Sequence, residues 1–185
     1  MAMSNYVKYP LVLGTVCLAC GVALAGVNFA TEPVIDAQIE AAKIAALYTI
    51  LDDNSLEVKN GADITDLAWD GDHAETLEVR KLVPCEDDDY YYYQATSEYG
   101  YSGTVTFGAL VDTDFAVVGF EYIAATEDAS IGIPYVKDIT ISLENPYTGG
   151  SLVSGETVEA GASAKFTQPV IELALQDIIA DAETI

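Results

Sequence analysis

One uncharged segment near the N-terminus constrains this chain more than any other feature. Residues 10–30 read PLVLGTVCLACGVALAGVNFA and contain no Asp, Glu, Lys, Arg or His. A helix needs about 20 such residues to cross the hydrocarbon core of a bilayer. Tyr6 and Tyr9 lie at the start of the segment, where aromatic rings prefer the membrane interface. The pattern predicts a transmembrane helix, and we expect residues 1–30 to form a membrane anchor.

The same segment is rich in small residues, among them Gly14, Gly21 and Gly26. Small residues let transmembrane helices approach closely, which favours packing against the helices of other membrane subunits. An isolated anchor that is merely rich in Ala and Gly is the alternative. A cleaved signal peptide is a second alternative, because Ala23-Leu24-Ala25 fits an A-x-A cleavage site.

Charge divides the chain at the end of this segment. Lys8 is the single charged residue before Glu32, so residues 31–185 hold six Lys and Arg against 30 Asp and Glu, a net charge of −24. The positive-inside tendency places the N-terminus in the cytoplasm and the acidic part outside the cell membrane. Such acidity excludes nucleic-acid binding and disfavours an anionic lipid surface. We interpret it as suited to a cation-rich milieu, with a surface that attracts basic partners as the alternative.

The counts of reactive residues exclude most catalytic and metal chemistry. Cys17 and Cys20 lie in the apolar segment, and Cys85 is the single cysteine beyond it, so no disulfide is available in residues 31–185. His73 is the single histidine and follows residues 69–72, which read as a tight turn. Without a second histidine or a cysteine nearby, a metal site is not expected. No nucleophile–base pair is present, and we predict neither catalytic residues nor metal ligands.

Helical periodicity predicts a helix at each end of residues 31–185, which we expect to form one domain. Thr31-Glu32-Pro33 is typical of a helix start, followed by an apolar stripe that ends near residues 52–54. The spanning helix is expected to run straight into this one. Thr167 is predicted to cap the final helix, with Pro169 in its first turn. We therefore expect a transmembrane helix continuing into an extracytoplasmic helix, and a second helix closing the domain at its C-terminus.

Between these helices the hydrophobic period changes to two, which predicts an antiparallel sheet and an α+β fold. The predicted strands cover residues 77–80, 104–107, 115–123 and 139–143. Asp112-Thr113-Asp114 is typical of a hairpin turn. Tyr90 to Tyr93 follow three Asp residues, and a strand there would place two tyrosines on each face. We interpret this strand as half-buried and edge-like, with flavin stacking by one tyrosine as the less favoured reading.

Residues 160–167 suit a ligand better than any other segment. Ala160, Gly161 and Ala162 are small enough to let a ligand approach the backbone, and Ser163 supplies a hydroxyl. A helix N-terminus is predicted within a few residues, and helix N-termini favour phosphate. Many small-residue loops lead into helices without any ligand, which is the alternative.

Several motifs in this order resemble the FMN-binding family that comprises RnfG of the Rnf electron transport complex and NqrC of the sodium-pumping NADH:quinone oxidoreductase. Residues 31–35 match its T-x-P-V-I helix entry, and residues 100–105 match its GY-x-G-x-I/V strand start. Glu127 and Gly132 are retained from its GxE/H-x-x-E-T-P-G-L-G stretch. Residues 157–163 match its D-x-x-S/A-G-A-T/S flavin attachment motif. The serial order covers essentially the whole chain.

The resemblance implies a covalent cofactor. In that family the last Thr or Ser of the motif carries FMN through a phosphoester, and Ser163 is the matching residue. It further implies that Lys165 lies where it can pair with the phosphate, although a solvated lysine is the alternative. The full set of cofactor-binding residues predicted on this basis is Ala160, Gly161, Ala162, Ser163, Lys165, Thr167 and Glu127.

The implied function is a membrane-anchored electron carrier without catalysis of its own, in an Rnf/Nqr-type redox-driven ion-translocating complex. Its partners would be the other membrane subunits. Thr157 stands where the family motif has Asp, and Lys165-Phe166 replaces small hydroxyl residues. These departures favour the alternative of a flavin-less structural or assembly subunit with the same fold. An unrelated acidic binding module on a membrane stalk is a third reading.

Overall fold

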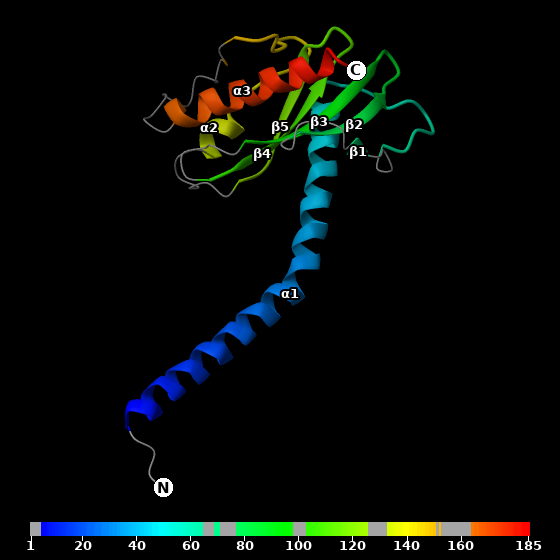
Figure 1. Cartoon of the computed structure of the whole chain (residues 1–185). Helices are drawn as coiled ribbons and strands as arrows, with labels where there is room; N and C mark the ends of the chain where they lie inside the picture. The colour runs from blue at the N-terminus through cyan, green and yellow to red at the C-terminus, as the bar shows by residue number, and fades with distance from the viewer. Residues whose placement is uncertain are drawn as a thin grey trace. The chain divides into compact units, whose positions relative to one another are not determined.

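A computed structural model describes residues 5–64, 69–70, 77–97, 103–125, 133–150, 152 and 164–185. The chain divides into two compact units, Met1–Glu40 and Ala41–Ile185. The elements, shown in Figure 1, are α1 (Asn5–Asp53), β1 (Trp69–Asp70), β2 (Leu77–Pro84), β3 (Asp89–Ser97), β4 (Val105–Val111), β5 (Val117–Ala125), α2 (Ile133–Lys137) and α3 (Ala164–Ala182).

Helix α1 is continuous over 49 residues. The prediction that the apolar segment runs straight into the next helix is confirmed, as is the end near residues 52–54. The prediction of a helix start at Thr31 is wrong, because the Thr31 hydroxyl donates to the carbonyl of Val27 at 3.0 Å, a bond made within a helix. The apolar run before Thr31 already supplies the preceding turns, so no cap is needed. From Leu11 onward the helix is long and apolar enough to cross a membrane.

The five strands form one antiparallel sheet in the order β1-β2-β3-β4-β5, so each strand pairs with its neighbours in the sequence. The predicted hairpin turn between β4 and β5 is confirmed. Its Asp112 carboxylate accepts the backbone N–H groups of Asp114 at 3.0 Å and Ala116 at 2.8 Å. The fold is α+β as expected, with a long N-terminal helix, an antiparallel sheet and a closing C-terminal helix.

Both faces of the sheet are covered within the unit Ala41–Ile185. The last turns of α1 pack on one face through Leu47, Ile50 and Leu51. Helix α3 packs on the other face through Ile171, Leu175 and Ile178, together with α2 (Figure 1). Because each face is buried, the strands carry apolar side chains in both directions.

The tyrosine strand β3 is central rather than edge-like, which corrects the sequence prediction. The expected alternation is confirmed, since Tyr90 and Tyr92 face α1 while Tyr91 and Tyr93 face α3. However, Tyr92 and Tyr93 are both 0% exposed. Tyrosine usually prefers half-buried positions, but a helix on each face removes both side chains from water. The burial comes from tertiary packing that a local pattern does not encode.

Two further predictions of local structure differ from the structure, and one helix was not predicted. Of the turn predicted over residues 69–72, Trp69 and Asp70 instead form the short strand β1, paired with β2, and the other two residues lie outside the described residues. Residues 139–143 form no strand, although Ile139 and Ile141 are buried at alternate positions as a strand would place them. The segment instead turns through mutual backbone hydrogen bonds between Ser142 and Asn145. Helix α2 is missing from the sequence predictions, because five residues are too few to show a helical period.

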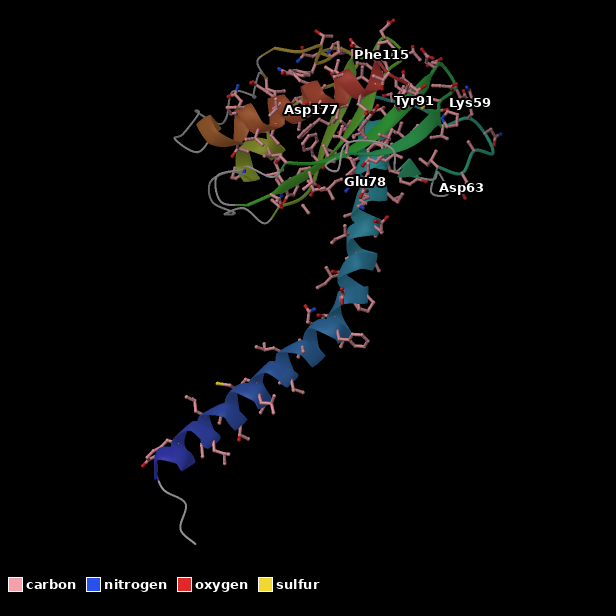
Figure 2. The ribbon with its side chains drawn as sticks, viewed as in Figure 1. Lys59, Asp63, Glu78, Tyr91, Phe115 and Asp177 are labelled. Atoms are coloured by element: carbon pink, nitrogen blue, oxygen red, sulfur yellow. The ribbon has the colours of Figure 1, made fainter. Side chains whose placement is uncertain are left out.

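Polar contacts fix the end of α1 on the sheet. Glu78 of β2, labelled in Figure 2, accepts a hydrogen bond from Lys43 Nζ at 3.1 Å. The buried Tyr92 hydroxyl donates to the Lys43 carbonyl at 3.0 Å. Gly119 on β5 has no side chain and so leaves room for Ile50. On the other face, the Tyr93 hydroxyl donates to the Asp181 carboxylate at 3.0 Å and ties β3 to α3.

Candidate functional site

The predicted attachment segment directly precedes α3. Ala160 to Ser163 and Glu127 lie outside the described residues, so their predicted roles stay predictions. Helix α3 begins at Ala164, one residue after Ser163. The predicted nearby helix N-terminus is therefore present. The first-turn N–H groups of a helix lack intrahelical partners and favour phosphate, which suits a phosphoester at this position.

Thr167 does not cap α3 as predicted, because the helix begins three residues earlier and places Thr167 in its first turns. Lys165 also lies in the first turn. The Thr167 side chain is 0% exposed, and its hydroxyl oxygen has no hydrogen-bond partner among the described residues. Burying a hydroxyl without a partner is unfavourable. The orphaned oxygen, four residues after Ser163, is an observation that fits a ligand or a backbone group from the neighbouring segment.

Both ends of the segment that contains Ser163 are held on α3. Leu152 precedes it, and the Leu152 N–H donates to Glu172 Oε1 of α3 at 2.7 Å. Gln168 Nε2 donates to the same oxygen at 2.8 Å and orients it. The other end enters α3 itself at Ala164. A group joined to Ser163 would therefore be tethered close to the start of a helix whose body is packed on the sheet.

Helix α2 contributes a second buried hydroxyl close to α3. Tyr135 is 1% exposed, and its hydroxyl has no hydrogen-bond partner within the described parts of the chain. Burial, followed by the nearby Glu172 carboxylate, raises the pKa of Tyr135 to about 12. Tyr135 therefore stays protonated at neutral pH and retains a hydrogen to donate.

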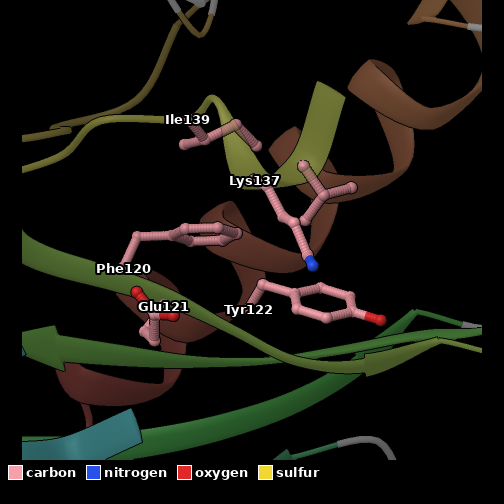
Figure 3. Close-up of a pocket in the computed structure, with 6 residues that line it drawn as sticks. Phe120, Glu121, Tyr122, Lys137 and Ile139 are labelled. Carbon is pink, nitrogen blue, oxygen red and sulfur yellow. The ribbon is translucent and has the colours of Figure 1, made fainter. Parts of the chain in front are cut away.

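A cavity of about 320 Å³ lies between β5 and the region of α2. Its lining residues are Phe120, Glu121, Tyr122, Val136, Lys137 and Ile139. Figure 3 shows the Lys137 ammonium above the Tyr122 ring, with Phe120 beside them. Lys137 Nζ lies 4.9 Å from the centroid of the Tyr122 ring, a cation–π contact.

Sequence reasoning did not single out this cavity. Its residues come from β5, from α2 and from Ile139, and none of the six belongs to a predicted motif. One signal was present, since Lys137 is among only six bases in a strongly acidic region. Lys43 and Lys59 make ion pairs with Glu78 and Asp89. Lys137 makes no ion pair with any residue that the structure describes, and its charge remains available at the cavity.

Glu121 has an unusual environment beside this cavity. Burial, followed by the negative charge of Asp53, raises the pKa of the Glu121 carboxyl, while Lys137 acts in the opposite direction. The charged form of Glu121 is therefore less favourable than that of an exposed glutamate. Among the described residues no group of His, Cys, Asp and Glu has the arrangement of a metal site.

Residues 1–50 match the family described as RnfG N-terminal region. The first 50 residues of the chain are RnfG-like. This similarity supports a single-pass membrane protein, because α1 is the one helix among the described residues that is long and apolar enough to cross a membrane. A search of curated proteins found no match.

RnfG proteins are flavin-associated members of the multi-subunit Rnf complex, so the match supports an Rnf-type electron-transfer subunit in general. The matched residues cover the helix up to Ile50, which packs on the sheet. The described residues beyond them contribute a helix start after Ser163 and an orphaned hydroxyl at Thr167. These features fit a flavin phosphate.

Proposed function

We propose that this RnfG-like chain is an electron carrier that holds FMN on Ser163 through a phosphoester, outside the membrane, in a redox-driven ion-translocating complex. One observation carries the proposal. An RnfG-type N-terminal region leads into an α+β domain whose last helix begins immediately after the serine of the attachment motif. The same topology positions both ends of that segment on α3.

The residues of the chain hold and orient the cofactor. Ser163 provides the oxygen that bonds to phosphorus, and the attachment leaves the protein heavier by one FMN less one water. The first-turn N–H groups of α3 and the Lys165 ammonium offset the phosphate charge. Thr167 offers its buried hydroxyl to the same region. FMN supplies the electron-transfer chemistry, and the protein supplies its position and electrostatic surroundings.

The acidity of residues 31–185 should affect the reduction potential of the flavin. A net charge of −24 opposes the addition of further negative charge, so we expect a low reduction potential. Salt should weaken this effect, because it screens exposed charges beyond about 10 Å at 0.1 M. A redox titration that gave an unusually high midpoint, insensitive to salt, would count against this part of the proposal.

The proposed orientation places the N-terminus in the cytoplasm and the sheet domain outside, because Lys8 precedes the apolar segment and acidic residues follow it. Protease treatment of intact cells or spheroplasts tests this. Digestion of the sheet domain is expected from the outer side of the membrane. Digestion only after the cells are broken would reverse the orientation.

An intact mass of the detergent-purified protein tests the proposal. The parent protein should show the added mass of FMN less water, and Ser163→Ala should lose it. Ser154→Ala, which removes a hydroxyl nine residues earlier, should keep it. A bare polypeptide mass in all three, from cells that flavinylate a control protein, would favour the flavin-less structural role suggested by Thr157 at the start of the motif.

A further inference from the structure

We propose that the open edge of the sheet, which is the outer side of β5 over residues 121–124, binds an extended basic segment of a partner chain as an added strand. Strand β5 lies beyond the 50 residues that match the RnfG N-terminal region. The inference does not rest on flavin at Ser163, because the backbone of β5 and the charges beside it belong to the chain itself.

The backbone of β5 is paired on one side only for most of its length. It is the last strand of the sheet and pairs with β4 along its inner side (Figure 1). On its outer side, Val117 donates to the Tyr147 carbonyl at 3.0 Å and accepts from the Tyr147 N–H at 2.8 Å. Beyond that bridge, no described residue outside β4 makes a backbone hydrogen bond with residues 119–124. Unpaired N–H and C=O groups of this kind are a template for another strand.

The open edge is also the part of β5 that water reaches. The residues from Val117 to Phe120 are buried, whereas those from Glu121 to Ala125 are all partly exposed. Natural sheets usually protect such an edge with proline, lysine or a very short strand. The sequence of β5, VVGFEYIAA, contains neither proline nor lysine and is nine residues long. The open edge therefore suits a partner strand better than it suits solvent.

The charges beside the open edge favour a basic partner on the face that α1 covers. Gly119 lies against Ile50 of α1, so Glu121, two residues further along the strand, is on the same face. Glu121 makes no ion pair with any residue that the structure describes, and Asp53 adds a second negative charge near it. Burial and then Asp53 keep the pKa of Glu121 raised, although Lys137 acts against them. A lysine or arginine opposite Glu121 on an added strand would lie within reach of its carboxylate.

The opposite face of the open edge disfavours a second basic residue. The Lys137 ammonium already lies 4.9 Å from the centroid of the Tyr122 ring on that face. Because side chains alternate along a strand, the added segment should carry basic residues at every second position and uncharged residues between them. A second copy of the chain is a poor occupant, since it would bring one net charge of −24 against another.

Hydrogen exchange of the detergent-purified full chain tests the proposal, with a short synthetic peptide of alternating lysine and valine as the probe. The peptide should slow the exchange of the backbone amides of residues 119–125 severalfold and leave those of β1, at the other end of the strand order, unchanged. A peptide of the same composition with all its lysines in one block is the control. It carries the same charge but cannot place its lysines on one face of a strand, so it should bind more weakly and protect β5 less.

A matched pair of variants tests the role of Glu121. Glu121→Gln should weaken the binding of the alternating peptide by roughly two- to fivefold relative to Glu57→Gln, which removes one exposed carboxylate outside β5. Equal binding of the two peptides without protection of β5, or equal effects of the two variants, would overturn the proposal. If the chain alone forms a dimer in which the amides of residues 119–125 are protected, the occupant is a second copy and the basic segment is wrong.

Discussion

A methyl group at position 119 should push the end of α1 away from the sheet. A Cβ built at Gly119 would overlap Cγ2 of Ile50 and lie 3.3 Å from Cβ of Leu110. Ile50 is 2% exposed, so its side chain has no free space to occupy. Overpacking of this kind costs about 1–3 kcal/mol, and replacing a strand glycine recovers about 0.5–1 kcal/mol. With the midpoints of both ranges, Gly119→Ala should therefore lower the free energy of unfolding by about 1 kcal/mol.

Denaturant unfolding in detergent, followed by the emission of the single tryptophan Trp69, measures this change. Gly21→Ala is the control, because nothing lies within 4 Å of a Cβ at that position. It should leave the transition of the sheet domain unchanged. Ile50→Ala removes the overlapping atom. The variant with both Gly119→Ala and Ile50→Ala should therefore lose less unfolding free energy than the two single variants lose together, by about 0.5 kcal/mol or more. A neutral Gly119→Ala, or strict additivity, would refute the packing argument.

Buried ionisable groups give three further predictions. Burial and the hydrogen bond to Asp181 raise the pKa of Tyr93 above its ordinary 10.0. Stability should therefore hold below about pH 10 and fall above it as the unfolded chain ionises, and Tyr93→Phe should flatten this decline in thermal melts. Glu121→Gln should raise the melting temperature at pH 7, with the gain disappearing below pH 4.5, where Glu121 is protonated in both states. Burial, then Asp89, raises the pKa of Cys85 to about 11, so a thiol reagent at pH 8 should label it only after unfolding.

The two long helices and most of the sheet could be predicted from the sequence, because their signals are local. The apolar run of residues 10–30 and the stripe beyond Thr31 merge into α1, and alternation marks β2, β4 and β5. The predicted helix start at Thr31 was wrong because Thr-Glu-Pro is typical of a helix start but also occurs inside this long helix. The sequence alone does not show which of these contexts applies.

The depth of burial on the sheet could not be predicted. The sequence predicted an edge strand at Tyr90 to Tyr93, because four tyrosines beside three Asp residues suggest a strand with one solvent-exposed face. The second covering layer comes from the end of α1, which is about 40 residues earlier in the chain. Likewise Ile139 and Ile141 alternate as in a strand and are buried in the core cluster that includes α3, but they belong to none of the strands that the structure describes.

The candidate site was predicted in part. The helix start near Ser163 followed from small residues leading into an apolar period. The cavity residues carry no such local sign, because Tyr122 and Lys137 meet only when α2 folds back on β5. A search for bases in an acidic domain would have drawn attention to Lys137, although not to its neighbours.

Peptide mapping tests the central claim most directly. Trypsin cleavage after Lys137 and Lys165 releases one peptide, Asp138 to Lys165, that contains Ser163. Fragmentation by mass spectrometry should place the mass of FMN less water on Ser163, with the other hydroxyl residues of that peptide unmodified. Full recovery of this peptide without the added mass, from cells that flavinylate a control protein, would contradict the account.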